Sequence, residues 1–342
     1  LQSDDDWKKL NRFLHGLAYL TIGLGVLTAL GVNTTIYPRG ADLYGRFAYG
    51  VFKFYNPAES LVYAMFIYNF WRYCFRPTWK NGLAAVVMAG GCTFFIFRAR
   101  LAGMALGMLV SLFFAPARVR GRAVVVGLVV AISAAIVLSA FGLVAASVTE
   151  TGGESYLGSL ADYFNEAVRG VTQRDTGDVL IRQIFIQMRW SMVKKNPWAG
   201  IGFVSPFGKV GWNMYRLGDM PVGHVDVGWL DALMRLGVIG SVILSLFLIS
   251  AAVEGRKLLA VNNLSEEDYA FGLTSVSYVV LMFVSTYSFS YPTWEEPILT
   301  FSLIFGWLMR VRRRLKESPA PEGEDRALHR MPLSLSAGRL GR

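Results

Sequence analysis

The feature that most constrains this chain is a series of long apolar runs that no charged residue interrupts. A helix rises about 1.5 Å per residue, so roughly 20 apolar residues cross about 30 Å of hydrocarbon. Because 54% of the residues are hydrophobic and only 17% are charged, the composition also argues against a soluble enzyme. We therefore predict an all-α fold, a polytopic bundle of about eight transmembrane helices. The spans are placed at 12–32, 59–75, 82–98, 101–117, 123–146, 233–252, 270–288 and 296–310.

The basic residues predict the orientation of these spans, because cytoplasmic loops retain Lys and Arg. They gather in the segments that the span assignment places on one face: Lys8, Lys9, Arg12, Arg72, Arg76, Lys80, Arg118, Arg120, Arg122, Arg256, Lys257, Arg310, Arg312, Arg313, Arg314 and Lys316. Both termini are therefore predicted to be cytoplasmic. The net charge of +10 is interpreted as a topology signal and an attraction to anionic lipid, which argues against a nucleic-acid partner.

This topology divides the chain into four parts. Residues 1–146 are expected to hold membrane helices one to five, 147–232 an extracytoplasmic loop, 233–312 helices six to eight, and 313–342 a cytoplasmic tail. The tail from Ser318 onward mixes Pro, Gly, Ser and charges without an apolar period, so we expect it to be disordered. The chain begins with Leu1 and shows no signal peptide, and we expect an amino-terminal truncation.

The large loop is predicted to contain short helices. Residues 158–171 have amphipathic spacing, and residues 178–195 place apolar side chains at helical intervals. Asp178 suits the start of the second helix, because its carboxylate can accept hydrogen bonds from the first free amide groups. Asn196 and Pro197 are expected to end it.

Metal-binding patterns are absent from the sequence, which has no His-x-x-x-His and no cysteine pair at ligand spacing. We therefore expect no metal and no cofactor. Cys74 and Cys92 lie in apolar runs and are interpreted as small buried hydrophobic residues. Glu295 and Glu296 are expected in a short outer turn, where they either bind a cation or polar sugar or are simply solvated.

Four segments carry a resemblance to a known family. Residues 182–202 resemble the Arg, helix, Pro and Gly-x-Gly element of the O-antigen ligase and O-antigen polymerase (Wzy-type) family, and residues 224–240 resemble its His or Asp motif, which leads into a membrane helix with Gly-x-x-Gly. Upstream, residues 46–58 resemble the family's Arg-, Gly- and Asn-containing loop, and Ala99-Arg100 resembles its Ser-Arg-Gly position. The four segments follow one another in the family's order.

The resemblance implies a GT-C-like membrane glycosyltransferase in the bacterial inner membrane, with its catalytic loop in the periplasm. Its donor would be a glycan linked to undecaprenyl diphosphate, and its acceptor a hydroxyl of a lipid A core or of a growing glycan. It would act as an O-antigen ligase or as a polymerase of O-antigen or exopolysaccharide, and the His-x-Asp-x-Gly arrangement favours a polymerase. Partners would include membrane lipid and a chain-length regulator or other assembly protein.

On this resemblance, Arg100 and Arg182 are expected to bind the donor diphosphate. A guanidinium stays charged and can bind two phosphate oxygens at once, so it can stabilise the charge that grows on the leaving group. Arg98 competes with Arg100 for this role, because side chains two residues apart on a helix point about 200° apart. Arg46 is a further candidate in the upstream loop.

The acceptor hydroxyl needs a base, and a histidine can accept a proton near neutral pH. Only His224 of the three histidines is expected outside the cytoplasm and the membrane, because His15 lies in the first span and His329 in the tail. Asp226 ranks second, and Asp226 or Asp231 could either orient the imidazole or replace it. Trp212 and Tyr215 are candidate contacts to the acceptor or to sugars.

A transporter or flippase for lipid-linked glycans is the alternative interpretation. Such a protein would need charged or broken helices near the middle of the membrane. Here the predicted spans are apolar at their centres and the polar residues gather at the outer face. This distribution favours chemistry at the outer surface over transport.

Overall fold

The computed structural model describes residues 4–29, 45–48, 51–54, 58–94, 98–129, 132–133, 177–202, 216–217, 220–221, 228–261, 264–288 and 295–317. Their helices are α1 Asp4–Ala29, α2 Glu59–Phe75, α3 Trp79–Phe94, α4 Arg98–Leu112, α7 Gly177–Lys195, α9 Gly228–Leu259, α10 Glu266–Ser288 and α11 Glu295–Glu317, and residues 117–129 are also helical. Two antiparallel hairpins pair β1 Gly45–Ala48 with β2 Val51–Phe54 and β3 Arg216–Leu217 with β4 Met220–Pro221. The all-α prediction is confirmed, with these short hairpins as its only strands in the described part of the chain.

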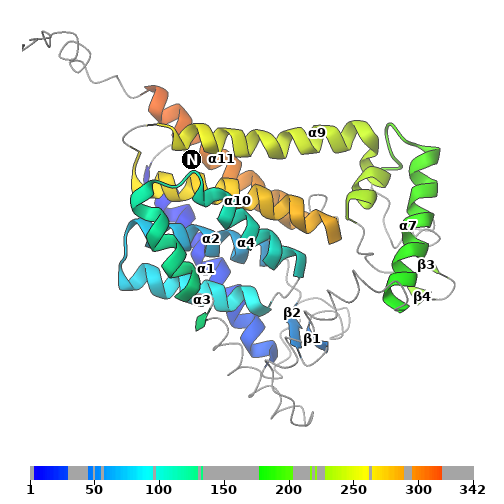
Figure 1. Cartoon of the computed structure of the whole chain (residues 1–342), viewed down its shortest axis with the longest axis horizontal. Coiled ribbons are helices and arrows are strands. Elements are labelled where there is room, and N and C mark those ends of the chain that lie inside the picture. The colour runs from blue at the N-terminus through cyan, green and yellow to red at the C-terminus, as the bar shows by residue number, and fades with distance from the viewer. Residues whose placement is uncertain are drawn as a thin grey trace, which may run out of the picture.

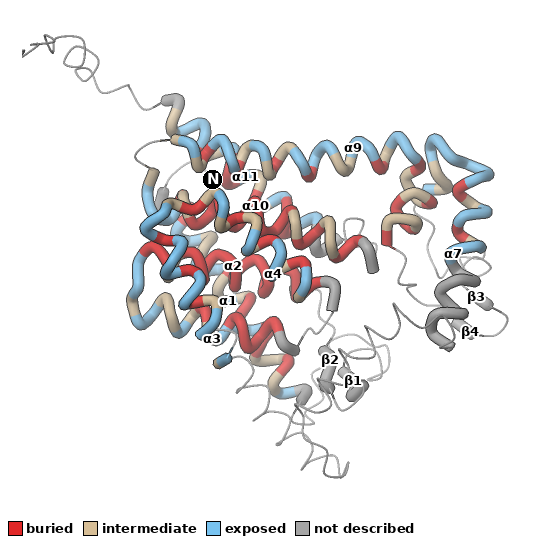
Figure 2. The backbone as a smooth tube through the Cα atoms, in the orientation of Figure 1, coloured by how far each residue is buried: buried red, intermediate tan, exposed pale blue. Residues whose placement is uncertain are grey.

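Helix α10 is the centre of the bundle and packs against α2, α4, α9 and α11 (Figure 1). Its residues Tyr278 and Leu281 are fully buried, and so are Tyr63 and Trp71 of α2. Figure 2 accordingly shows α2 and α10 as mostly buried, whereas buried and exposed residues alternate along α9. The bundle is therefore ordered by large apolar side chains around one central helix.

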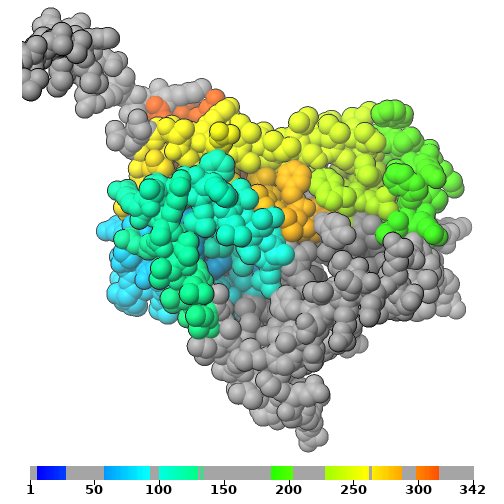
Figure 3. All heavy atoms as spheres, in the orientation of Figure 1, coloured from blue at the N-terminus to red at the C-terminus, as the bar shows by residue number. Residues whose placement is uncertain are grey.

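Among the described residues, three helical stretches are long and apolar enough to cross a membrane: Asp6–Leu27, Gly228–Leu259 and Glu266–Thr286. Helix α9 exposes Ile239, Ile243 and Leu246 along its length, a face that suits lipid rather than water. In Figure 3 the atoms of α9 form a long exposed band that meets α7 at one end. The chain is an integral membrane protein, and the number of spans stays a prediction.

The helix boundaries agree with most of the predicted spans. Helix α2 covers the residues predicted for the second span, and α4 and α10 lie within a few residues of theirs. Helix α1 begins at Asp4, earlier than predicted, and α9 extends to both sides of the predicted span. Helix α11 continues through the basic run to Glu317, because Arg and Lys are good helix formers that need no apolar environment. Of the predicted span 123–146, most residues lie outside the described part of the chain.

Small residues let α4 approach α10 closely. A Cβ atom at Gly107 would lie 2.3 Å from the backbone oxygen of Ser277, and one at Gly103 would lie 3.0 Å from that of Leu281. The hydroxyl groups of Ser277 and Ser111 are hydrogen-bonded at 2.8 Å. Packing of small residues and interhelical hydrogen bonds hold membrane helices together where no hydrophobic effect does.

Basic side chains cap the helix ends at one end of the bundle. Arg122 donates from Nη1 to the backbone oxygen of Cys74 at 2.8 Å, at the end of α2. Arg120 donates to the backbone oxygens of Ala115 and Phe113, just after α4. The last carbonyl groups of a helix have no partner within it, so these arginines satisfy groups that a membrane would otherwise leave bare.

Ion pairs join the helices at this same end. Arg72 of α2 pairs with Glu267 of α10 at 3.0 Å, Arg312 of α11 with Glu254 of α9, and Arg314 of α11 with Asp268 of α10, while Lys257 and Glu254 pair within α9. The basic residues that predicted one face thus gather at one end of the bundle. The assignment of this end to the cytoplasm stays a prediction.

Candidate functional site

At the opposite end of the bundle, α7 packs against the beginning of α9 (Figure 1). Helix α9 is not continuous there, because Gly237 has φ 65° and ψ −175°. The short first segment, residues 228–236, lies beside α7, and the long segment runs back along the bundle. A break in a helix leaves backbone amide and carbonyl groups without their usual partners.

The loop after α7 supplies those partners. We call residues 196–202 and 234–239 together the glycine clasp. Its backbone hydrogen bonds run from Ile201 N to Met234 O at 2.9 Å, Gly202 N to Arg235 O at 2.9 Å, Val238 N to Pro197 O at 2.8 Å and Ile239 N to Trp198 O at 3.2 Å. The loop therefore bonds to α9 on both sides of the break.

The clasp requires glycine at two positions. Gly200 has φ 67°, and a Cβ atom there would lie 2.5 Å from the backbone oxygen of Arg235. Gly237 has φ 65°, and its Cβ atom would lie 2.2 Å from the backbone oxygen of Trp198. Both the left-handed backbone and the close approach exclude a side chain. The Gly-x-Gly and Gly-x-x-Gly elements that carried the resemblance therefore meet in space.

A second contact, the arginine–aspartate joint of Arg189, Asp231 and Arg235, fixes α7 to α9. Arg189 Nη2 lies 3.5 Å from Asp231 Oδ1, and Arg235 Nε lies 2.8 Å from Asp231 Oδ2. Asp231 is 1% exposed and Arg189 3% exposed, so both charges are removed from water. The two charges are buried as a pair, since a single unpaired charge at this depth would strongly destabilise the protein.

The arginine–aspartate joint lies close in the sequence to the candidate catalytic residues Arg182, His224 and Asp226. Arg182 lies on α7 seven residues before Arg189, hence on nearly the same side and about 10 Å along the helix. Its side chain lies outside the described residues, as do His224 and Asp226. Because consecutive Cα atoms are about 3.8 Å apart, Asp226 Cα stays within about 8 Å of that of Gly228, where α9 begins. Asp231 belongs to the joint and contacts both arginines.

Arg100 lies in a buried ion pair with Glu59. Glu59 is the first residue of α2 and Arg100 the third of α4, and the side chains are 6% and 3% exposed. Arg98 begins α4, and Arg46 lies in β1 opposite Lys53, but neither side chain is among those described. The structure thus brings Arg100 together with a carboxylate that was not among the sequence candidates.

The remaining candidates are placed less fully. Trp212 and Tyr215 lie outside the described residues. Glu295 and Glu296 were expected in a turn, and this is corrected, because they are the first two residues of α11. Acidic residues are favoured there by the positive end of the helix dipole.

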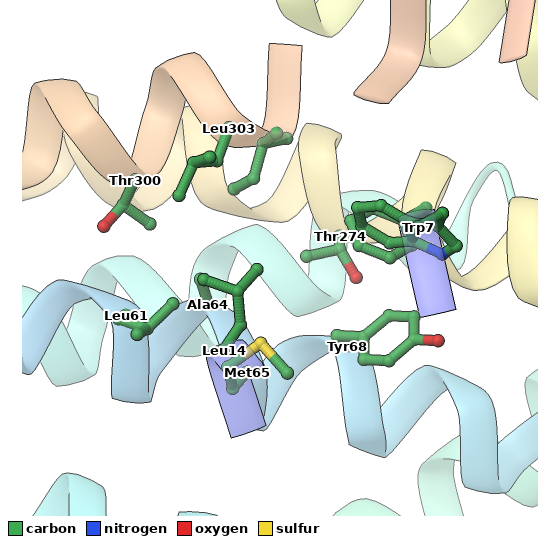
Figure 4. Close-up of a pocket in the computed structure, with 11 residues that line it drawn as sticks. Trp7, Leu14, Leu61, Ala64, Met65, Tyr68, Thr274, Thr300 and Leu303 are labelled. Atoms are coloured by element: carbon green, nitrogen blue, oxygen red, sulfur yellow. The ribbon is translucent and has the colours of Figure 1, made fainter. Parts of the chain in front are cut away.

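Metal ligands are not gathered in the described residues, where no three His, Cys, Asp or Glu side chains come together. Cys74 and Cys92 are free and buried, as expected of small apolar residues. A narrow cavity inside the bundle is lined by Trp7, Leu14, Leu61, Ala64, Met65, Tyr68, Phe271, Thr274, Thr300, Leu303 and Ile304 (Figure 4). It has no charged lining residue, so it does not suit a diphosphate.

Sequence reasoning missed Glu59 and Arg189. Glu59 stands at the first position of a predicted span in a chain with only 24 acidic residues, and this was the available signal. Arg189 lies seven residues after Arg182, which places both on one face of the predicted helix. Their partners could not be read from the sequence, because each partner lies on a different helix.

Residues 83–245 match the family described as O-antigen ligase. The matched segment begins in α3 and ends in α9 beyond Gly237, so it holds Arg100, the arginine–aspartate joint and the glycine clasp, while Glu59 and Arg46 precede it. No curated protein matches the chain.

Proposed function

Because residues 83–245 place the chain in the O-antigen ligase family, whose members are membrane enzymes of polysaccharide assembly, we propose that it transfers glycan from an undecaprenyl-diphosphate donor to a hydroxyl acceptor. The observation that carries this proposal is the position of the matched segment. It contains both a buried arginine at the start of α4 and the clasp that leads into α9.

On the donor side, Arg100 and Arg182 bind the diphosphate, and Arg98 and Arg46 add positive charge. The bond between the anomeric carbon and the diphosphate oxygen breaks, and its electron pair stays on the diphosphate. Fixed guanidinium groups stabilise this growing charge most strongly where water is excluded. Burial of the Arg100 side chain supports such a role.

On the acceptor side, the hydroxyl oxygen forms the new bond to the anomeric carbon, and His224 takes its proton. Asp226 orients the imidazole or replaces it as the base, and Trp212 and Tyr215 offer flat faces to sugars. Undecaprenyl diphosphate leaves, so charge and atoms balance without a metal or another cofactor. The arginine–aspartate joint and the glycine clasp support this scheme, because they hold the helix of Arg182 against the helix that follows His224.

The reaction is placed at the outer leaflet of the bacterial inner membrane, with residues 147–232 in the periplasm. The acceptor is a lipid A core for a ligase or a growing glycan for a polymerase, and the His-x-Asp-x-Gly arrangement favours the polymerase. A chain-length regulator or another assembly protein is the expected partner.

The test expresses the full-length protein in a host without its own polymerase and ligase. Surface glycan ladders are compared for wild type, His224→Ala, Arg182→Ala and Arg100→Ala at matched expression, and lipid-linked intermediates are extracted in parallel. We expect each variant to lose at least about 100-fold of the long glycan, because general bases and charge-stabilising groups each contribute about that factor. Lipid-linked donor should accumulate in the outer leaflet.

Three outcomes separate the alternatives. Donor that accumulates in the inner leaflet of the variants would identify a transporter or flippase and overturn the proposal. Wild-type ladders in His224→Ala would remove the base from the mechanism. A residual ladder that stays on the carrier would identify a ligase within the same proposal.

A further inference from the structure

Glu59 and Arg100 connect the ends of two helices that belong to different parts of the sequence. Glu59 begins α2 and Arg100 lies in the first turn of α4, with α3 between them in the chain. Helices α2 and α4 both pack on α10, so these two beginnings lie at one end of the bundle. That end is opposite to the one where Arg72 pairs with Glu267. The pair therefore lies at the end of the bundle where the donor is proposed to bind.

Burying the Glu59–Arg100 ion pair costs desolvation free energy, so the pair holds the two helices together inefficiently. Arg100 is 2% exposed and Glu59 5% exposed, so both charges lose their water. The attraction within such a pair often only balances this loss, and an apolar pair of the same size can stabilise a protein more. Stability alone therefore gives a poor account of the pair, whereas a role in binding an anion gives a direct one.

A phosphate group and a carboxylate are alternative ligands for a guanidinium. Both present two oxygen atoms at a spacing that suits its N–H groups, and both carry the charge that neutralises it. An anion that replaces Glu59 keeps Arg100 neutralised, and the released Glu59 carboxylate lies in the first turn of α2, at the positive end of the helix dipole. We propose that Glu59 is the resting counterion of Arg100, that the donor diphosphate displaces it, and that this competition excludes the phosphodiester headgroups of surrounding phospholipids.

Phospholipid headgroups are excluded from Arg100 because Glu59 competes with every anion for the same guanidinium. The dissociation constant of every anion rises by the factor by which Glu59 reduces the available Arg100. A phosphodiester carries one negative charge and binds weakly, so this factor removes its occupancy even where lipid is abundant. A diphosphate carries more charge and more acceptor oxygens, so it still binds. The inference rests on the proposed function, because it takes the donor diphosphate as the ligand.

The test measures binding alone, without acceptor or turnover. Farnesyl diphosphate is titrated into the purified full chain in detergent, with and without short-chain phosphatidylglycerol, for wild type, Glu59→Gln, Glu59→Asp and Arg100→Ala. We expect Glu59→Gln to bind farnesyl diphosphate about tenfold more tightly than wild type, because the Glu59 carboxylate no longer competes for Arg100. Phosphatidylglycerol should compete in Glu59→Gln and leave wild type unaffected. Arg100→Ala should bind most weakly.

Glu254→Gln is the matched control, because Glu254 pairs with Arg312 and Lys257 at the other end of the bundle. Its dissociation constant should equal that of wild type. Glu59→Asp keeps the charge and shortens the side chain, so it should fall between wild type and Glu59→Gln, and it serves as the test if Glu59→Gln does not fold. The inference is overturned if Glu59→Gln, or Glu59→Asp in its place, binds like wild type or as weakly as Arg100→Ala. Competition by phosphatidylglycerol in wild type would overturn it as well.

The two proposals fail in different ways. If Glu59→Gln binds farnesyl diphosphate more tightly but lipid-linked donor accumulates in the inner leaflet of the His224, Arg182 and Arg100 variants, the counterion proposal stands and the transferase proposal is overturned. If the glycan ladder is lost in His224→Ala with donor in the outer leaflet, but Glu59→Gln binds farnesyl diphosphate like wild type, the transferase proposal stands and the counterion proposal is overturned.

Discussion

Asp231 shows how a single residue can organise this site. It forms ion pairs with Arg235 on its own helix and with Arg189 on α7, and it is the acidic residue in the first turn of α9. The sequence analysis considered Asp231 only as a helper or substitute for His224. Its observed contacts give it a positioning role instead, since both carboxylate oxygens face arginine nitrogens.

We therefore predict that Asp231→Ala destabilises the protein by about 3–5 kcal/mol, because it removes the buried carboxylate that Arg189 and Arg235 face. Thermal unfolding of the detergent-purified chain measures this loss. Glu254→Gln again provides the comparison, since an ion pair at an exposed position contributes at most about 1 kcal/mol. Equal unfolding of Asp231→Ala and wild type would show that the joint does not hold α7.

At the scale of elements, the break in α9 and the loop after α7 form one unit. Proline at 197 ends the continuation of α7, and the left-handed glycines turn the loop back onto α9. The carbonyl and amide groups released at Gly237 are the ones that the loop binds. The glycines of the family motifs in this region are thus explained by backbone geometry.

Gly237→Ala is expected to open the clasp. The substitution adds a left-handed strain of about 1–2 kcal/mol and a clash with the backbone oxygen of Trp198, which cannot move without breaking its own hydrogen bond. We expect a lower unfolding temperature and faster amide exchange at Val238 and Ile239, measured by hydrogen–deuterium exchange mass spectrometry.

Gly202→Ala separates the two effects, because Gly202 has φ 78° but, its chain neighbours aside, no atom of the described residues lies within 4 Å of a Cβ there. Gly202→Ala should lower the unfolding temperature through its backbone strain, while amide hydrogen exchange at Val238 stays near that of wild type. If both variants behave alike, the close approach at Gly237 contributes nothing.

At the scale of the whole molecule, the two ends of the bundle differ in chemistry. One end is closed by arginines that cap helices and by ion pairs between α2, α9, α10 and α11. The other end holds the Glu59–Arg100 pair, the arginine–aspartate joint and the glycine clasp.

Reporter fusions test which end faces the cytoplasm. We expect alkaline phosphatase to be active when fused after Ala146, and a fluorescent protein to fluoresce when fused after Ala251, because the basic end should stay inside. The opposite pattern would place residues 147–232 in the cytoplasm. The lipid-linked donor could then not reach the proposed site.

The local sequence predicts the helices and the all-α fold class. A membrane accepts only segments that satisfy their own backbone hydrogen bonds, and such segments appear in the sequence as runs of apolar residues. The sequence also identified Arg100, Arg182 and the glycine motifs as residues of one family's pattern. The packing of the helices shows that Glu59 neutralises Arg100 and that Asp231 lies between two arginines. It also shows that the backbones around Gly200 and Gly237 lie in close contact. These contacts join residues from separate helices, and the depth at which a charge is buried depends on how helices pack, which no local pattern encodes.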